Sequence, residues 1–191
     1  LYLDQAKHIA FGFISVPPLS SIISAIIFLL GGEIFWVRFF PALFGALTIL
    51  FAWLTIEQLG GKVYSKVLVS CALIFSVYMR LNILYQPNAF DILAWTAAFY
   101  FFVRYIRDVE NRWLLFLMIT LVLGFYNKYN IVFLIAGLLF GILLTRHRNI
   151  FSKKYFYISL TMGLILVLPN ILWQVSNNFP MIYHMQALKN T

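Results

Sequence analysis

The strongest constraint on this chain is a series of apolar runs separated by short links that carry Lys and Arg. The run from Phe35 to Ile56 contains no charged residue except Arg38, and it reaches the roughly 20 residues that a transmembrane helix needs. Over the whole chain, 63% of the residues are apolar and 10% are charged, which excludes an ordinary soluble domain. We therefore expect an all-α fold, a polytopic transmembrane helical bundle.

The apolar runs predict about six transmembrane helices within residues 35–173. They cover 35–56, 67–84, 90–103, 113–126, 131–144 and 155–173. The run from Leu19 to Leu30 is too short to span, because Pro17-Pro18 and Gly31-Gly32 bound it. We expect a juxtamembrane or re-entrant helix there. We therefore expect residues 1–191 to belong to one transmembrane domain. Residues 1–34 form an outer-face juxtamembrane region, and residues 174–191 form an outer-face segment.

The basic residues gather in three links, at 62–66, 104–112 and 146–154. Six spans place all three links on one side, which the positive-inside rule assigns to the cytoplasm. This placement accounts for much of the net charge of +8, so we reject a nucleic-acid partner. The opposite, outer side then carries charged and titratable residues that could take part in binding or catalysis. They are Asp4, His8, Arg38, Arg80, Asp91 and Lys128.

Asp91 stands out because it places a carboxylate in an otherwise apolar helical run. Pro87 stops the preceding segment, and Asn88 is expected to cap a new helix with Asp91 in its first turn. A carboxylate at membrane depth indicates a functional role by default, preferably with a cation nearby. Arg80 is the first candidate partner. The alternative is that Asp91 only caps its helix from the headgroup zone.

Cations beside a carboxylate at the outer boundary suit an amphiphilic substrate with an anionic head, because Lys and Arg hold phosphate. Arg38, Arg80, Lys128 and His8 are the candidate binding residues. The alternatives are that Arg38 and Lys128 extend to lipid headgroups and that His8 is a surface histidine. The sequence contains no paired His/Cys spacing for a metal, no phosphate-cradling Gly loop and no nucleophile motif, which leaves the cofactor unassigned.

Five motifs follow one another along nearly the whole chain. They are His8–Leu19, Trp36–Leu47, Tyr85–Asp91, Tyr126–Tyr129 and Leu168–Gln174. Together they resemble glycosyltransferase family 39, which includes enzymes similar to protein O-mannosyltransferases and aminoarabinose transferases. The resemblance identifies the family better than the substrate.

The resemblance implies a GT-C fold and an inverting transferase that takes sugar from a polyprenyl-phosphate donor. It implies a lipid, glycan or protein acceptor at the outer face of a bacterial inner membrane. Asp91 would support catalysis, and Arg38, Arg80, Lys128 and His8 would contact substrate. Relatives carry an Asp-Glu pair that would fall just before Leu1. We therefore expect the main base upstream and the chain to be part of a longer protein.

A non-enzymatic protein of another class is the alternative. A transporter, a flippase or a structural membrane subunit also combines apolar spans with a few charges at the outer face. An inverted repeat of these helices would favour a transporter. A further span followed by Asp-Glu would favour the enzyme.

Overall fold

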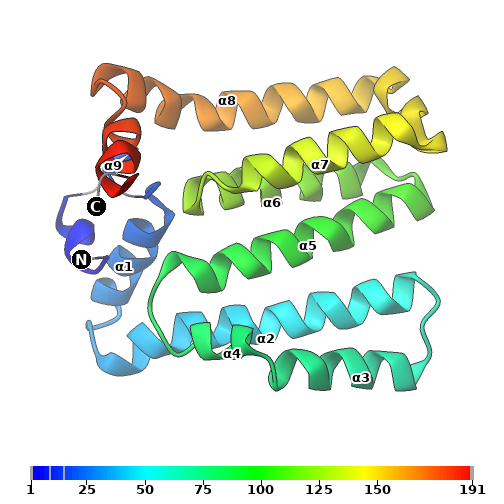
Figure 1. The fold of residues 1–191 in the computed structure, drawn as a ribbon, viewed down its shortest axis with the longest axis horizontal. Helices are drawn as coiled ribbons and strands as arrows, with labels where there is room; N and C mark the ends of the chain where they lie inside the picture. The colour runs from blue at the N-terminus through cyan, green and yellow to red at the C-terminus, as the bar shows by residue number, and fades with distance from the viewer. Residues whose placement is uncertain (1, 9, 15, 190–191) are drawn as a thin grey trace.

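The computed structural model describes residues 2–8, 10–14 and 16–189, and within these residues it contains helices and no strand. The elements are η1 (Asp4–Lys7), α1 (Leu19–Leu29), α2 (Ile34–Gln58), α3 (Val63–Ile74), α4 (Val77–Leu81), α5 (Pro87–Asp108), α6 (Asn111–Asn127), α7 (Ile131–Leu144), η2 (Arg146–Ser152), α8 (Lys154–Ser176) and α9 (Pro180–Lys189). Figure 1 shows α2, α3, α5, α6, α7 and α8 lying side by side, with α1 and α9 at one end of this bundle.

Three of these helices, α2, α5 and α8, are long and apolar enough to cross a membrane. The count rises to four if α7 and η2, which are bent by 110° relative to each other, form one broken span. Helix α1 has 11 residues, in agreement with the expectation that it does not span. The all-helical membrane character is confirmed, whereas six crossings are not established.

Helix α5 forms the centre of the bundle and packs against α2 on one side and α6 on the other. It presents four buried alanines, Ala89, Ala94, Ala97 and Ala98. Small side chains allow helix backbones to approach closely, which is how membrane helices gain packing energy without a hydrophobic driving force. Helix α6 then packs against α8, and α2 against α3. Large apolar side chains such as Phe133 and Leu164 point outward, as expected for contact with lipid.

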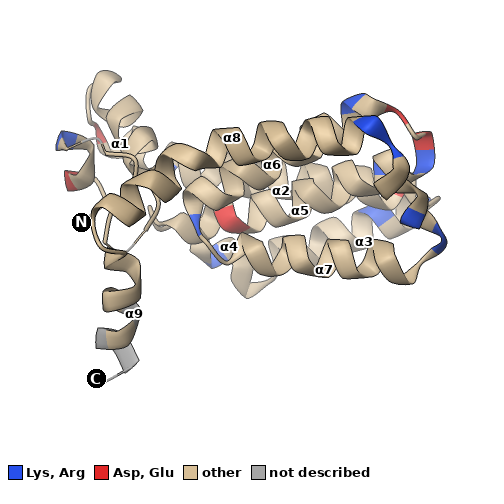
Figure 2. Cartoon of the chain, turned by 90° about the horizontal axis from the view of Figure 1, so that it is seen from above, with Lys and Arg blue, Asp and Glu red and all other residues tan. Residues whose placement is uncertain are grey.

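The three basic links lie at the same end of the bundle, which we call the basic end. Figure 2 shows Lys and Arg concentrated there, around the connections α2–α3, α5–α6 and α7–α8. The other end, which we call the outer end, holds α1, α9 and the start of α5 (Figure 1). The predicted grouping of the links at one end is therefore observed, and the name of the outer end keeps the sequence-based expectation that the basic end faces the cytoplasm.

The predicted continuous helix over 67–84 is wrong. Helix α3 ends at Ile74 and the short α4 begins at Val77. The Ser76 hydroxyl donates to the Leu73 carbonyl over 2.7 Å, and a serine that bonds nearby backbone competes with the helical ladder. The helix also begins earlier than predicted, at Val63.

Candidate functional site

The link between α6 and α7 brings three polar side chains against the start of α5. Asn127 donates from Nδ2 to the Pro87 carbonyl over 2.9 Å. Lys128 donates from Nζ to Asn88 Oδ1 over 3.1 Å, and Asn130 donates from Nδ2 to Asp91 Oδ2 over 2.8 Å. We call these residues the link cluster: Asn88, Asp91, Asn127, Lys128 and Asn130. The cluster joins Asp91 and Lys128, both predicted from sequence, at the outer end.

Helix α5 positions its half of the cluster through its own start. Pro87 occupies the first helical turn, where its missing N–H costs nothing. The predicted cap at Asn88 is wrong, because Gln86 holds the cap position and Asn88 lies inside the helix. Asp91 is therefore beyond the first turn, which contains no acidic residue. Asn88 and Asp91 are three residues apart and share one helix face.

Two oxygen atoms of the cluster are buried and have no donor among the described residues. They are Oδ1 of Asp91 and Oδ1 of Asn130. A carboxylate accepts and never donates, so the Asn130 amide must turn its nitrogen toward Asp91 and leave its oxygen free. Buried acceptors without donors are costly. These two oxygens have unused acceptor capacity, but the protein encloses them, so a ligand hydroxyl reaches them only if the surrounding side chains move.

Tyr129, the remaining residue of the link, connects it to α8. Its hydroxyl donates to Asn170 Oδ1 over 3.0 Å and accepts from Gln174 Nε2 over 2.9 Å. Burial raises the pKa of the Tyr129 phenol, and the hydrogen bonds with Asn170 and Gln174 oppose this shift. The Asn170 Nδ2 group donates onward to the Phe11 carbonyl over 2.6 Å. The link thus holds α5, α8 and the N-terminal segment together.

A glycine and a tryptophan complete the contact between the N-terminal segment and α8. A side chain at Gly12 would overlap the Trp173 ring. Trp173 covers this glycine and is only partly exposed. Together with Asn170, it fixes the N-terminal segment over the end of α8.

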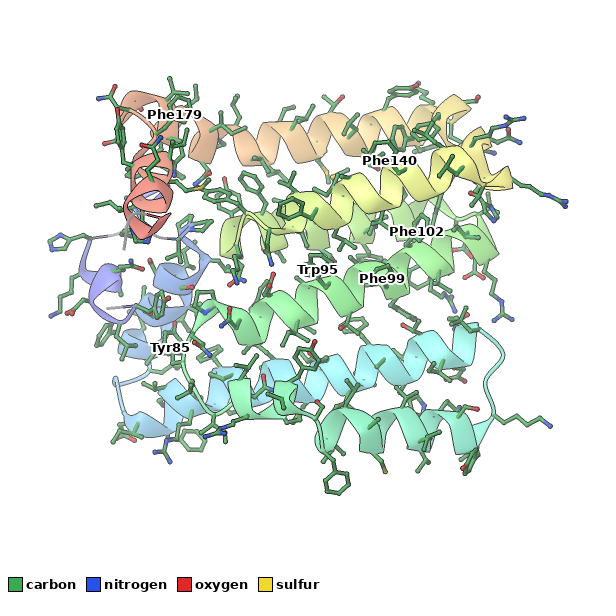
Figure 3. The ribbon with its side chains drawn as sticks, in the orientation of Figure 1. Tyr85, Trp95, Phe99, Phe102, Phe140 and Phe179 are labelled. Carbon is green, nitrogen blue, oxygen red and sulfur yellow. The ribbon has the colours of Figure 1, made fainter. Side chains whose placement is uncertain are left out.

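Tyr85 ties α1 to the connection that enters α5 (Figure 3). Its hydroxyl lies 2.8 Å from the Ser20 carbonyl, to which it donates, and 2.8 Å from Ser24 Oγ. Burial raises the pKa of Tyr85 to about 12, and the hydrogen bond with Ser24 opposes the shift. The phenol therefore remains protonated at neutral pH and holds α1 across the outer end.

The other predicted site residues lie outside the link cluster. Arg38 on α2, Arg80 on α4 and His8 are exposed, and none forms a side-chain hydrogen bond or ion pair with another described residue. The expected pairing of Arg80 with Asp91 is absent from the described residues: Asp91 accepts a hydrogen bond from Asn130 instead, and Arg80 is exposed on α4. No three His, Cys, Asp or Glu residues in the described ranges could hold a metal ion together.

An apolar groove of about 240 Å³ opens beside the α8 contacts of the link. It is lined by Ala10, Phe11, Pro18, Leu19, Ile22, Leu123 and Tyr126. Phe11 also accepts the hydrogen bond from Asn170, and Tyr126 donates to the Leu166 carbonyl of α8 over 2.6 Å. The groove could hold the hydrocarbon part of an amphiphilic molecule whose polar head reaches the outer end.

Lys128 and Asp91 were predicted from the sequence, but the buried amides that fix the link against α5 and α8 were not. Asn127 and Asn170 are each 1% exposed, and neither was a predicted site residue. The sequence contained a signal for them: an asparagine inside an apolar helical run must find hydrogen-bond partners, because burying an unpaired amide is costly.

Comparison with known families gives one match. The family model described as dolichyl-phosphate-mannose-protein mannosyltransferase matches residues 15–173. No curated protein and no solved structure matches the chain. The matched range contains α1 to α8 except the last residues of α8, and it includes the whole link cluster.

Proposed function

The chain belongs to the dolichyl-phosphate-mannose-protein mannosyltransferase family, and from this premise we propose that it transfers a sugar from a polyprenyl-phosphate donor. The acceptor is a lipid, a glycan or a protein at the outer face of a bacterial inner membrane. The fold is of the GT-C type, with six crossings that include the shorter helices α6 and α7. One observation carries the proposal: Asp91 on α5 and Asn130 on the link each hold a buried oxygen that has no donor among the described residues, in the same cluster as Lys128.

Lys128 is proposed to hold the donor phosphate. Its ammonium group has three N–H donors, and the bond to Asn88 uses one of them. The acceptor hydroxyl oxygen attacks the anomeric carbon, a carboxylate base takes the hydroxyl proton, and the bond from that carbon to the phosphate oxygen breaks. The departing phosphate takes the electron pair, and the Lys128 charge stabilises it.

The sugar is proposed to lie against Asp91 and Asn130. Sugar hydroxyl groups are hydrogen-bond donors, and the two oxygens, which are enclosed in the structure, supply matching acceptors once the side chains around them move to admit the sugar. Asp91 thereby orients the sugar for attack. Arg38, Arg80 and His8 are proposed to contact substrate from the exposed rim of the same end, where they are not committed to partners within the described residues.

The polyprenyl chain is proposed to enter the apolar groove beside Leu123 and Tyr126. An apolar groove at the same end as the link cluster fits a lipid-linked donor better than a soluble one. A transport function would require a path between the two ends. The buried apolar core between the ends, which includes Ala98, Leu117 and Leu121, favours an enzyme that works at one face.

Reconstitution tests this function. The complete protein in proteoliposomes, supplied with a panel of polyprenyl-phosphate sugars and with lipid, glycan and peptide acceptors, is expected to form glycosylated product. Mass spectrometry of the acceptors detects transfer, and empty liposomes are the control. Movement of intact donor across the bilayer without any product would contradict the proposal and support a flippase.

A further inference from the structure

A second cleft lies at the basic end, far from the link cluster along α5. It has a volume of about 210 Å³ and lies between the end of α5, η2 and the start of α8. Its polar lining comes from Tyr105, Arg146, His147, Asn149 and Lys153. Nothing in the proposed transfer reaction uses these residues.

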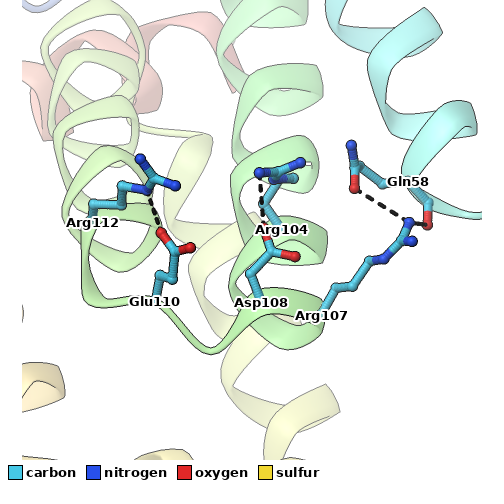
Figure 4. A network of polar contacts seen from close by, with 6 residues as sticks. All are labelled: Gln58, Arg104, Arg107, Asp108, Glu110 and Arg112. Carbon is cyan, nitrogen blue, oxygen red and sulfur yellow. Dashed lines mark hydrogen bonds and ion pairs between the residues drawn. The ribbon is translucent and has the colours of Figure 1, made fainter.

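The charge in this cleft is not neutralised by the protein. In the neighbouring link, Arg104 pairs with Asp108 over 2.8 Å and Arg112 pairs with Glu110 (Figure 4). Arg146 and Lys153, by contrast, form no ion pair with any described residue. The end of α5 adds only a partial negative charge of about half a unit, which two full positive charges outweigh. The cleft is therefore suited to an anion.

Hydrogen-bond donors in the cleft support the same conclusion. Tyr105 is 3% exposed, and its hydroxyl has no hydrogen-bond partner among the described residues although it lines the cleft. Lys153 occupies the cap position of α8 and provides no side-chain cap. The first N–H groups of a helix point at whatever lies before it, and they favour a negative group there.

An apolar cavity of about 80 Å³ adjoins the cleft. The two share Tyr105 and Ile150, and the cavity continues between Phe102, Leu114, Ile142 and Phe156. A cationic cleft that borders an apolar cavity at a membrane surface matches a phospholipid, whose phosphate and acyl chain are joined in one molecule. A free anion would occupy the cationic cleft but would leave the adjoining apolar cavity empty.

We propose that this cleft binds the headgroup of an anionic phospholipid from the leaflet at the basic end. Arg146 and Lys153 contact the phosphate, Tyr105 donates a hydrogen bond to it, and the small apolar cavity accommodates only the first few methylene groups of an acyl chain. Basic pockets between membrane helices on the cytoplasmic side have the chemistry for this recognition. The site would anchor η2 at the membrane surface and does not depend on the proposed transfer reaction.

Native mass spectrometry of the complete protein in detergent tests the site. The protein is titrated with phosphatidylglycerol, with cardiolipin, with phosphatidylcholine and, separately, with inorganic phosphate. Anionic lipid is expected to bind more tightly than phosphatidylcholine, and millimolar phosphate is not expected to displace it. The double variant Arg146→Gln/Lys153→Gln should weaken binding of the anionic lipids by about fivefold for each cation removed.

The same link offers a matched control. Arg148→Gln/Lys154→Gln removes the same charge from exposed residues that do not line the cleft, and it should change lipid binding less than twofold. Tyr105→Phe removes only the hydroxyl and should weaken binding with no loss of folded protein. Equal losses in the two double variants, equal binding of phosphatidylcholine, or displacement by phosphate would overturn the proposal.

Discussion

The Asp91→Asn variant is expected to lose about 100-fold in transfer rate, the size of effect that follows removal of one preorganised electrostatic group. Its fold should persist, because an asparagine oxygen can accept the hydrogen bond that Asn130 now donates to Asp91. The amide nitrogen would then replace the free Oδ1 atom that we assign to the sugar. The rate is measured in proteoliposomes with lipid-linked donor, and the amount of folded protein by size-exclusion chromatography.

Asp4→Asn is the matched control for this experiment. Asp4 is also a carboxylate at the outer end, but it is exposed and pairs only with Lys7 over 3.2 Å. This variant should retain its transfer rate. Full activity of Asp91→Asn, or an equal loss in both variants, would show that Asp91 has no specific role in the reaction.

Gly124→Leu is expected to destabilise the bundle by about 1–3 kcal/mol, as overpacking of a close-packed interior does. Gly124 is buried on α6, and a Cβ atom there would lie 2.9 Å from Ile131 Cγ1 and 3.4 Å from Ala94 Cβ. Ile131 is fully buried and begins α7, so it cannot move without displacing the link. Loss of transfer activity should therefore accompany the lower stability, which is measured by thermal unfolding in detergent.

Gly137→Leu provides the comparison for Gly124→Leu. Gly137 lies within α7, and a Cβ atom at this position meets nothing within 4 Å. Leucine is also a better helix former than glycine, so this variant should be at least as stable as the original protein. If Gly124→Leu unfolds at the same temperature as Gly137→Leu, the close packing of α5, α6 and α7 is not as described.

The main features of this fold can be predicted from the sequence, because they depend on the lengths of the apolar runs and on where the positive charges lie along the chain. The apolar runs predict helices, and the grouping of Lys and Arg predicts which links share an end. Pro87 likewise indicates a helix start, although the cap falls at Gln86 rather than Asn88. The break after Ile74 was missed because Ser76 alone is a weak signal, and its effect depends on the local bond to Leu73.

The partners of Asp91 could not be predicted in the same way. Arg80 is near in sequence and carries the opposite charge, yet Asn130 supplies the observed hydrogen bond. That partner depends on how α6 and α7 return against α5, which is a property of helix packing rather than of sequence distance. The hydrogen bonds that join Tyr129 to Asn170 and Asn170 to Phe11 also link residues far apart in the sequence, and only the folded structure brings these residues together.

We propose that the outer end binds the lipid-linked donor through the groove and the link cluster. Site-specific photo-crosslinking tests it most directly, with a photoreactive residue at Leu123 in the groove or at Phe140 on α7. Both side chains are exposed, at 41% and 64%, and Phe140 lies toward the basic end (Figure 3). A radiolabelled donor with a short polyprenyl chain is used, so that its hydrocarbon does not reach across the bilayer.

We expect the label to attach to the protein with the probe at Leu123 and not to the protein with the probe at Phe140. Unlabelled donor should suppress the reaction at Leu123, and unlabelled phosphatidylcholine should not. Equal labelling at both positions, or labelling at Phe140 alone, would contradict a donor site at the outer end.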